Sequence, residues 1–337
     1  MAHLLSRENC NPEVGQLLRV NGDLYTMKGA VGDGAAGLVR KVSRQRDEKI
    51  FAVKFLAPDP KYIEEGNFDD VAERFKKEGQ KGSRLDNPFL VKIFSYEDNT
   101  NGSSFILSEK SPPRNPLLLM EFLPGKTLES SIKRTPDEQQ KKFEVNQYRL
   151  LIALQITRAL EYLHKRKLIH RDIKPANIFL LSKVADYPCV KIGDFGIMKW
   201  GDFHASLSTG ILTATNQQGL GTLKYMSPEQ AIQPRDVTVR SDIYSLGITL
   251  FELFTGQILI SPHHVFRTMM ARMERGTTYS RYHNMGLHLM PGDERIAEMI
   301  LDMHMKGISS RPSIDKVYGT LSSEYERRFG HSWTGIV

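Results

Sequence analysis

The sequence predicts an α+β fold in which a small β-rich lobe precedes a larger, mainly helical lobe. Residues 20–57 form short apolar and β-branched runs broken by glycine, a pattern typical of a meander of strands. Two later segments, 146–166 and 239–256, carry apolar residues at helical spacing, and the second is apolar on nearly all faces. The pattern changes at Pro124-Gly125, so we place a hinge at 121–125. The predicted organisation is a leader at 1–19, a first lobe at 20–123, a second lobe at 124–328 and a C-terminal tail at 329–337.

Shorter signals complete this outline. The first lobe should contain one main helix at 69–86 and two further strands at 89–96 and 117–122. Residues 97–116 are rich in turn formers and lack periodicity, so we expect an exposed insert there. In the second lobe we expect strands at 178–181 and 189–192 and further helices near 262–275, 293–305 and 313–327.

Composition limits the class of protein. The chain has 337 residues, of which 40% are hydrophobic and 25% charged, as in ordinary globular proteins. The longest apolar runs, 117–123 and 246–254, are shorter than the ~20 residues that cross a bilayer, and the first ten residues lack the apolar core of a signal peptide. We therefore expect no membrane partner and a location in the cytosol or nucleus. Cys10 and Cys189 are the only cysteines, which argues against a disulfide framework or a zinc site.

The net charge of +7 raises the question of nucleic acid. The basic residues are spread along the chain and matched locally by acids, so a nucleic-acid partner is not expected. A basic balance also suits a protein that binds ATP.

A glycine-rich stretch, GDGAAGLV at 32–39, has the pattern G-x-G-x-x-G-x-V. This pattern alone also fits a dinucleotide-binding fold, in which a helix follows directly. Here the following residues read instead as a strand, a polar turn and a second strand that ends in Ala52-Val53-Lys54. Glycines at 32, 34 and 37 let a hairpin place backbone N–H groups on phosphate oxygens, and Lys54 can reach the α and β phosphates. Gly32, Gly34, Gly37 and Lys54 are therefore candidates for nucleotide binding, although on this motif alone a plain glycine hairpin stays open until the later motifs are considered.

Two further motifs, HRDIKPANIFL at 170–180 and IGDFG at 192–196, are the strongest signals in the sequence. With the glycine loop before them and SRPS at 310–313 after them, they make the chain resemble the eukaryotic-type protein kinases over roughly residues 22–328. The resemblance implies a protein-kinase-like fold, ATP and Mg²⁺ as cofactors, and a protein substrate. Its implied function is transfer of the γ-phosphate of ATP to serine or threonine hydroxyls.

The chemistry of phosphoryl transfer explains why these residue types recur. The protein must align an acceptor hydroxyl, hold Mg²⁺ on the phosphates and stabilise developing charge. By resemblance, Asp172 accepts or orients the hydroxyl proton, Lys174 stabilises the γ-phosphate, and Asn177 and Asp194 bind Mg²⁺. Supporting roles in the structure fall to Arg171, Phe195, Gly196, Thr222, Glu229, Asp242 and Arg311. Of these, Glu229 is expected to pair with Arg311, and Asp242 to brace the catalytic loop.

The resemblance also implies where adenine binds. Adenine is expected between Val39, Ala52 and Phe179, hydrogen-bonded to the backbone of Glu121, Phe122 and Leu123. Met120 takes the position that gates the pocket behind adenine, although a methionine there also serves simply as a space-filling core residue.

Within the family, Lys174 and GTLKY at 221–225 resemble the serine/threonine branch. GTLKYMSPEQ, SDIYSLGITLFELFTG and the insert are similar to the kinases of the α subunit of eukaryotic initiation factor 2. NIMA-related and other general serine/threonine groups stay open. A different alternative is a pseudokinase or scaffold that binds nucleotide or partners with little catalysis, and a third is a nucleic-acid binder.

The activation segment follows Asp194. Its usual phosphorylated position lies four or five residues before Thr222, where this chain has Gln217 and Gln218. Thr213 and Thr215 remain candidates for phosphorylation, as do Ser208 and Thr209. We expect only a modest dependence of activity on phosphorylation of this segment.

The helix at 75–86 raises a separate question. By resemblance Glu78 pairs with Lys54, whereas Gly82 stands where a bulky residue normally packs on Phe195 in a column with Ile93 and His170. One hypothesis is that the helix is loose and is ordered by an activating partner or by homodimerisation through the first lobe. The alternative is a one-residue alignment shift, or compensation by Phe75 and Leu85.

Overall fold

The computed structural model describes most of the chain, as follows: residues 10, 12–34, 37–57, 68–101, 103–106, 114–132, 146–184, 187–194, 224–232, 237–256, 293–304 and 307–334. Two compact units divide these residues between Pro124 and Gly125.

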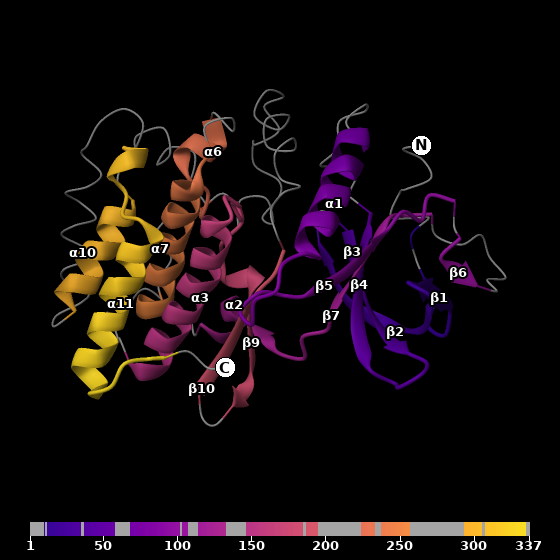
Figure 1. The fold of residues 1–337 in the computed structure, drawn as a ribbon, viewed down its shortest axis with the longest axis horizontal. Helices are drawn as coiled ribbons and strands as arrows, with labels where there is room; N and C mark the ends of the chain where they lie inside the picture. Colours follow the sequence, from indigo (N-terminus) through magenta and orange to yellow (C-terminus); the bar gives the residue numbers. More distant parts are fainter. Residues whose placement is uncertain are drawn as a thin grey trace. The chain divides into compact units, whose positions relative to one another are not determined.

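The first unit is built on a seven-stranded antiparallel sheet with the order β5-β7-β4-β3-β2-β1-β6 (Figure 1). Its elements are β1 (Leu17–Val20), β2 (Asp23–Gly34), β3 (Gly37–Arg44), β4 (Ile50–Leu56), α1 (Phe68–Gly82), β5 (Ile93–Glu97), β6 (Phe105–Ile106) and β7 (Leu117–Glu121). The expected strand meander at 20–57 is therefore confirmed, with β1 starting inside the segment expected as a leader.

Strand register assigns the side chains to two faces of this sheet. Lys54 lies opposite Val39 on β3 and opposite Leu118 on β7. Because residues directly opposite each other point to the same face and neighbours along a strand alternate, these three side chains share one face. We call this the Lys54 face.

The helix α1 packs on the Lys54 face through its glycines. A Cβ atom added at Gly79 would lie 2.4 Å from Leu118 Cδ2 and 2.7 Å from Tyr96 Cβ. The glycine is therefore needed for the close approach of helix and strands. Phe75, fully buried one turn earlier, adds a T-shaped contact with the ring of Tyr96 at 6.2 Å.

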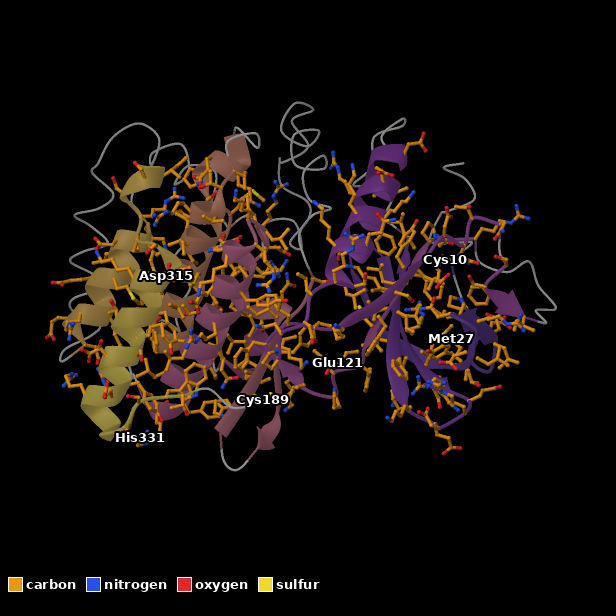
Figure 2. All side chains as sticks on the ribbon, viewed as in Figure 1. Cys10, Met27, Glu121, Cys189, Asp315 and His331 are labelled. Carbon is orange, nitrogen blue, oxygen red and sulfur yellow. The ribbon has the colours of Figure 1, made fainter. Side chains whose placement is uncertain are left out.

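The opposite face of the sheet carries a second hydrophobic core. It contains strand residues such as Met27 and Val53 together with Cys10 and Phe105; Cys10 and Met27 are labelled in Figure 2. The rings of Phe55 on β4 and Phe105 on β6 stack at 6.0 Å, although these strands lie far apart in the sheet order. The sheet must therefore curl so that strands β1 and β6 cover the face of β4 that lies opposite the Lys54 face.

This core corrects the expected exposed insert. Asn99, Phe105 and Asn115 are at most 8% exposed, and β6 pairs with β1. The Asn115 side chain donates to Leu56 O at 2.6 Å, which ties the end of the insert to β4. The sequence did not reveal these buried asparagines, because asparagine suits turns and also forms buried hydrogen bonds with the backbone.

The second unit is mainly helical, with a small three-stranded sheet in the order β10-β9-β8. Its elements are β8 (Lys126–Thr127), α2 (Leu128–Ser131), α3 (Gln147–Lys165), the 3₁₀ turn Pro175–Asn177, β9 (Ile178–Val184), β10 (Tyr187–Ile192), α6 (Pro228–Ile232), α7 (Val239–Thr255), α10 (Glu294–Met303), the 3₁₀ turn Ile308–Ser310 and α11 (Ile314–Phe329). The helix α7 is buried on all sides from Ser241 to Thr255. It starts at a Thr238–Ser241 capping box and ends at Gly256 with φ of 71°.

The structure confirms some of the other predicted elements and changes the bounds of others. The helices near 293–305 and 313–327 are confirmed as α10 and α11, whereas 262–275 lies outside the described residues. The helix expected at 69–86 ends at Gly82, and the strand expected from 89 starts at Ile93. Within the described part of the chain, no helix is long and apolar enough to cross a membrane.

Candidate active site

The first unit brings Lys54 and Glu78 together. Lys54 Nζ on β4 lies 3.7 Å from Glu78 Oε1 on α1, and the two side chains are 9% and 3% exposed. The Glu78 carboxylate and the Lys54 ammonium are both buried, and each compensates the charge of the other, which would be costly to bury alone. This places α1 and the expected phosphate-binding lysine in one polar contact.

The position of Gly82 corrects the hypothesis of an unfilled site. A Cβ atom there would lie 2.5 Å from Ile93 Cδ1, so the Ile93 side chain already occupies that space. The helix α1 is regular through Gly82. Sequence reasoning missed this because a glycine carries no information about the residue that faces it.

The glycine-rich hairpin joins β2 to β3. A Cβ atom at Gly37 would lie 2.0 Å from Phe55 O, so glycine is required there by the passing backbone of β4. A Cβ atom at Gly32 would meet no protein atom within 4 Å. Glycine at 32 is thus not explained by internal packing, and the space beside it suits the close approach of a ligand to the backbone. Gly34 is the last residue of β2.

The residues expected around adenine divide between the two units. In the first unit Ala52 is buried and lies opposite Met120, while Val39, Met120, Glu121, Phe122 and Leu123 are partly exposed. Glu121 N donates to Lys92 O at 2.9 Å, which fixes the start of this segment to the chain before β5. Phe179, on β9 of the second unit, is also partly exposed.

Asp172 in the second unit is held by several contacts. Lys174 Nζ lies 3.1 Å from Asp172 Oδ2, and Asn177 Nδ2 donates to the same oxygen at 2.6 Å. Asn177 Nδ2 also donates to the Asp172 carbonyl at 2.9 Å. These contacts fix the orientation of the carboxylate and join three of the expected site residues.

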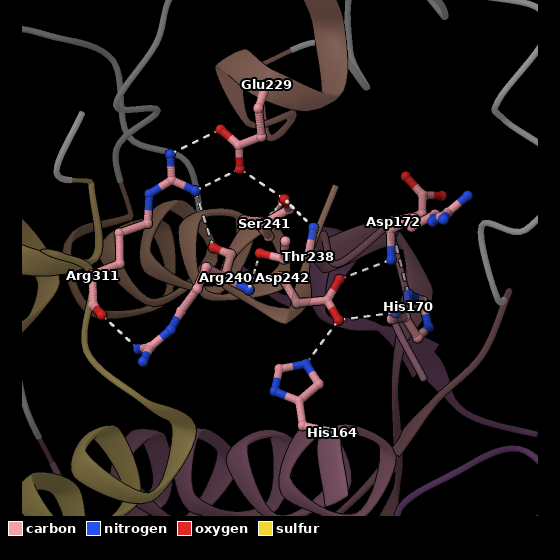
Figure 3. Close-up of polar contacts among 11 residues, drawn as sticks. His164, His170, Asp172, Glu229, Thr238, Arg240, Ser241, Asp242 and Arg311 are labelled. Carbon is pink, nitrogen blue, oxygen red and sulfur yellow. Dashed lines mark hydrogen bonds and ion pairs between the residues drawn. The ribbon is translucent and has the colours of Figure 1, made fainter. Parts of the chain in front are cut away.

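The backbone before Asp172 is strained and braced. Arg171 has φ of 69°, a left-handed conformation that non-glycine residues seldom adopt. Asp242 on α7 accepts from the backbone N–H groups of His170 and Arg171 at 2.9 and 2.8 Å, and His164 Nε2 lies 2.9 Å from the same carboxylate (Figure 3). The fully buried Asp242 therefore braces this loop.

His170 supports the same loop from inside. Burial lowers the pKa of His170, although the charges of Asp242, Asp172 and Asp194 act in the opposite direction. A neutral imidazole can accept a hydrogen bond, and Asp172 N lies 3.3 Å from His170 Nδ1.

Glu229 on α6 and Arg311 form a bidentate pair, with distances of 2.6 and 2.9 Å (Figure 3). Ser241 Oγ adds a hydrogen bond to Glu229 Oε1 at 2.7 Å. Burial alone would raise the pKa of Glu229, but the hydrogen bonds and charge of Arg311, together with Ser241, hold it below its ordinary value. The pair is structural, because Arg311 is 2% exposed and its fork is committed to Glu229.

The donor chemistry expected for Mg²⁺ is present. Asn177 uses its Nδ2 on Asp172, so its amide oxygen is the atom that suits a cation. Asp194 is exposed and has φ of 54°. The described residues contain no group of three or more histidine, cysteine, aspartate or glutamate side chains that could hold a metal ion.

Two contacts of this region were missed from the sequence. Gln230 Nε2 donates to Arg171 O at 2.7 Å, so the strained residue is held on its carbonyl side as well. His164 at the end of α3 contacts Asp242. A glutamine after Ser-Pro-Glu carries no pattern that could have revealed its contact, whereas an inward-facing histidine in the last turn of a helix is at least a weak signal.

Some predicted residues lie outside the described part of the chain. These are Phe195, Gly196 and Thr222, together with the activation-segment residues Ser208, Thr209, Thr213, Thr215, Gln217 and Gln218. Their roles stay predictions, as do the catalytic and binding roles of the residues described above.

A β-rich unit with a buried lysine–glutamate pair and a helical unit with an Asp-Lys-Asn loop define a protein-kinase-like α+β fold. The chain belongs to the protein kinase domain family, whose model matches residues 25–321. The kinase domain of Mycobacterium tuberculosis PknI has the same fold, with a TM-score of 0.62 and 20% identity over 94% of this chain and 100% of that one.

Two similar curated proteins come from bacteria. The chain is 32% identical over 238 residues to a probable serine/threonine-protein kinase PknB of Bifidobacterium longum, covering 70% of this chain and 31% of that protein. It is 33% identical over 240 residues to the serine/threonine-protein kinase PrkC of Bacillus subtilis, covering 71% and 31%. The matched region therefore spans about a third of the length of these relatives.

Proposed function

We propose that this protein is an ATP-dependent serine/threonine protein kinase that transfers the γ-phosphate of ATP to hydroxyl groups of a protein substrate. The observation that carries the proposal is the joint contact of Lys174 and Asn177 with Asp172 on a strained, braced loop. Membership of the protein kinase family and the names of its bacterial relatives support it.

We propose a task for each group of this site. Asp172, with its carboxylate oriented by Asn177, would orient the acceptor hydroxyl and receive its proton. Lys174 would stabilise negative charge on the transferred group. Lys54, positioned by Glu78, would bind the α and β phosphates below the glycine-rich hairpin. Asn177 and Asp194 would hold Mg²⁺, which neutralises charge on the phosphates when bound.

Two finer expectations gain no support from the relatives or from the described residues. The relatives are bacterial serine/threonine kinases and give no support to the initiation factor 2 α kinase group, so the proposal stays with the general class. The activating partner or homodimer was inferred from an unfilled position at Gly82, and Ile93 fills that position. The location in the cytosol or nucleus stays a prediction.

The scaffold alternative depended on a weak helix at residues 75–85. Because α1 is formed and Glu78 reaches Lys54, the described residues give this alternative no support.

The test is transfer of radiolabelled phosphate from ATP to a generic protein substrate, with mass-spectrometric mapping of the modified residues. We expect serine and threonine phosphorylation that is abolished by Asp172→Asn and by Asp194→Asn. Asp315→Asn is the matched control, because Asp315 is an exposed aspartate in the first turn of α11 (Figure 2). Equal signals from the unsubstituted protein and Asp172→Asn would overturn the proposal.

A further inference from the structure

An ion pair joins the two strands of the glycine-rich hairpin. Arg40 Nη1 on β3 lies 2.6 Å from Asp33 Oδ1 on β2, and it also donates to Val39 O at 3.1 Å. Asp33 is the residue between Gly32 and Gly34. The ion pair therefore involves a residue flanked by two glycines, which allow more backbone conformations than other residues.

The register shows which way Arg40 points. Val39 lies opposite Lys54, whereas Arg40 lies opposite Val53, a residue of the second core. Because neighbours alternate, Arg40 points away from the Lys54 face. Its charge is thus directed at Asp33 and not at the face where Lys54 would meet phosphates.

The two partners differ in burial. The Arg40 side chain is 8% exposed and that of Asp33 is 52% exposed. Cys10 lies in the second core on the same face, and the charges of both Arg40 and Asp33 act on its thiol, whose pKa burial raises to about 12. The low exposure of the Arg40 side chain shields the guanidinium from water, which strengthens its contact with Asp33.

We propose that Arg40 is a positioning residue for the nucleotide: through Asp33 it holds the glycine-rich hairpin in the conformation that receives the phosphates. The inference rests on the proposed ATP-dependent function and adds a device for preorganisation to it. Without the pair, the glycines on both sides of Asp33 give the hairpin more conformations, and ATP binding must then order them.

The test measures the Kd of ATP by calorimetry for Asp33→Asn, Arg40→Met and the double variant. Each single change should weaken binding about tenfold, equivalent to about 1.4 kcal/mol, and the double variant should lose no more than a single one because both remove the same contact. In the kinase assay the KM for ATP should rise by the same factor while kcat stays within about twofold. Asp33→Asn decides the matter if Arg40→Met does not fold, because Asp33 is half exposed.

Arg44→Met is the matched control. Arg44 lies on the same strand and pairs with Asp47 at 2.5 Å in the turn that follows β3, so its loss should leave the Kd of ATP unchanged. Wild-type affinity in Asp33→Asn, or an equal loss in Arg44→Met, would overturn the inference while ATP binding itself stands. If the unsubstituted protein binds no ATP, the proposed function and the inference both fall.

Discussion

Two of the buried ion pairs among the described residues differ in their geometry. Glu229 and Arg311 meet through two short contacts of 2.6 and 2.9 Å, with Ser241 as a further donor. Lys54 and Glu78 meet at 3.7 Å, beyond hydrogen-bond distance. The first pair fixes one arrangement of its elements. The position of the second pair depends on the packing of α1 on the sheet as well as on charge.

This comparison predicts that the Glu229–Arg311 pair, which has the shorter contacts, governs the stability of the protein. Arg311→Leu leaves the buried Glu229 carboxylate without its partner and should lower the free energy of unfolding by about 3–5 kcal/mol. Chemical denaturation measures the change. The control is Arg295→Leu, since Arg295 is 66% exposed and its buried partner Glu324 keeps Arg327; losing an exposed partner of this kind should cost about 0–1 kcal/mol. Equal losses in the two variants would remove the distinction.

The looser pair should govern activity. Glu78→Gln keeps the shape of the side chain but removes the charge that holds Lys54, so kcat/KM for ATP should fall about 10- to 100-fold, or about 1.4–2.8 kcal/mol. The free energy of unfolding should fall as well, because the buried Lys54 loses its compensating charge. Glu73→Gln is the matched control on the same helix, because Glu73 is exposed and pairs only at the surface with Lys77. A fully active Glu78→Gln protein would contradict the assigned role.

Helix α1 offers a test of what positions Glu78. Gly79→Ala brings a Cβ atom against Tyr96 Cβ and Leu118, and this overpacking should cost about 1–3 kcal/mol of stability. Gly82→Ala meets only the end of the Ile93 side chain, which can move, so its cost should be smaller. Thermal unfolding of the two variants checks the order.

Gly82→Leu extends this test to the earlier hypothesis. A leucine must displace Ile93 and should lower stability without raising basal activity. A gain of basal activity in Gly82→Leu would restore the hypothesis of a loose helix.

The sequence was sufficient for features encoded at short range. Asp172, Lys174 and Asn177 lie within one loop, and the resemblance of that loop to protein kinases predicted that they act together. The helices α7, α10 and α11 were likewise readable from their periodicity.

Features that depend on distant parts of the chain were not readable. Leu17 pairs with Ile106, which joins the segment expected as a leader to the segment expected as an exposed insert. Neither segment has a sequence pattern that identifies the other as its partner. The same holds for Gly82 and Ile93, and for Arg40 and Asp33, whose contact depends on which face of the hairpin is covered. Local periodicity reports which face of an element is buried, but not what buries it.

The Glu229–Arg311 pair also predicts how the stability of the protein changes with pH. Because Arg311 and Ser241 hold the pKa of Glu229 below its ordinary value of 4.5, the pair contributes stability that is fully present above pH 4.5. This contribution is lost as the pH falls through the lower pKa of the folded state, with a slope no steeper than about 1.4 kcal/mol per pH unit. Glu229→Gln has no such proton to gain. The difference in Tm between the unsubstituted protein and Glu229→Gln should therefore be constant from pH 7 to 5 and narrow below pH 4.5. A difference that narrows already above pH 5.5 would show that another group controls the effect.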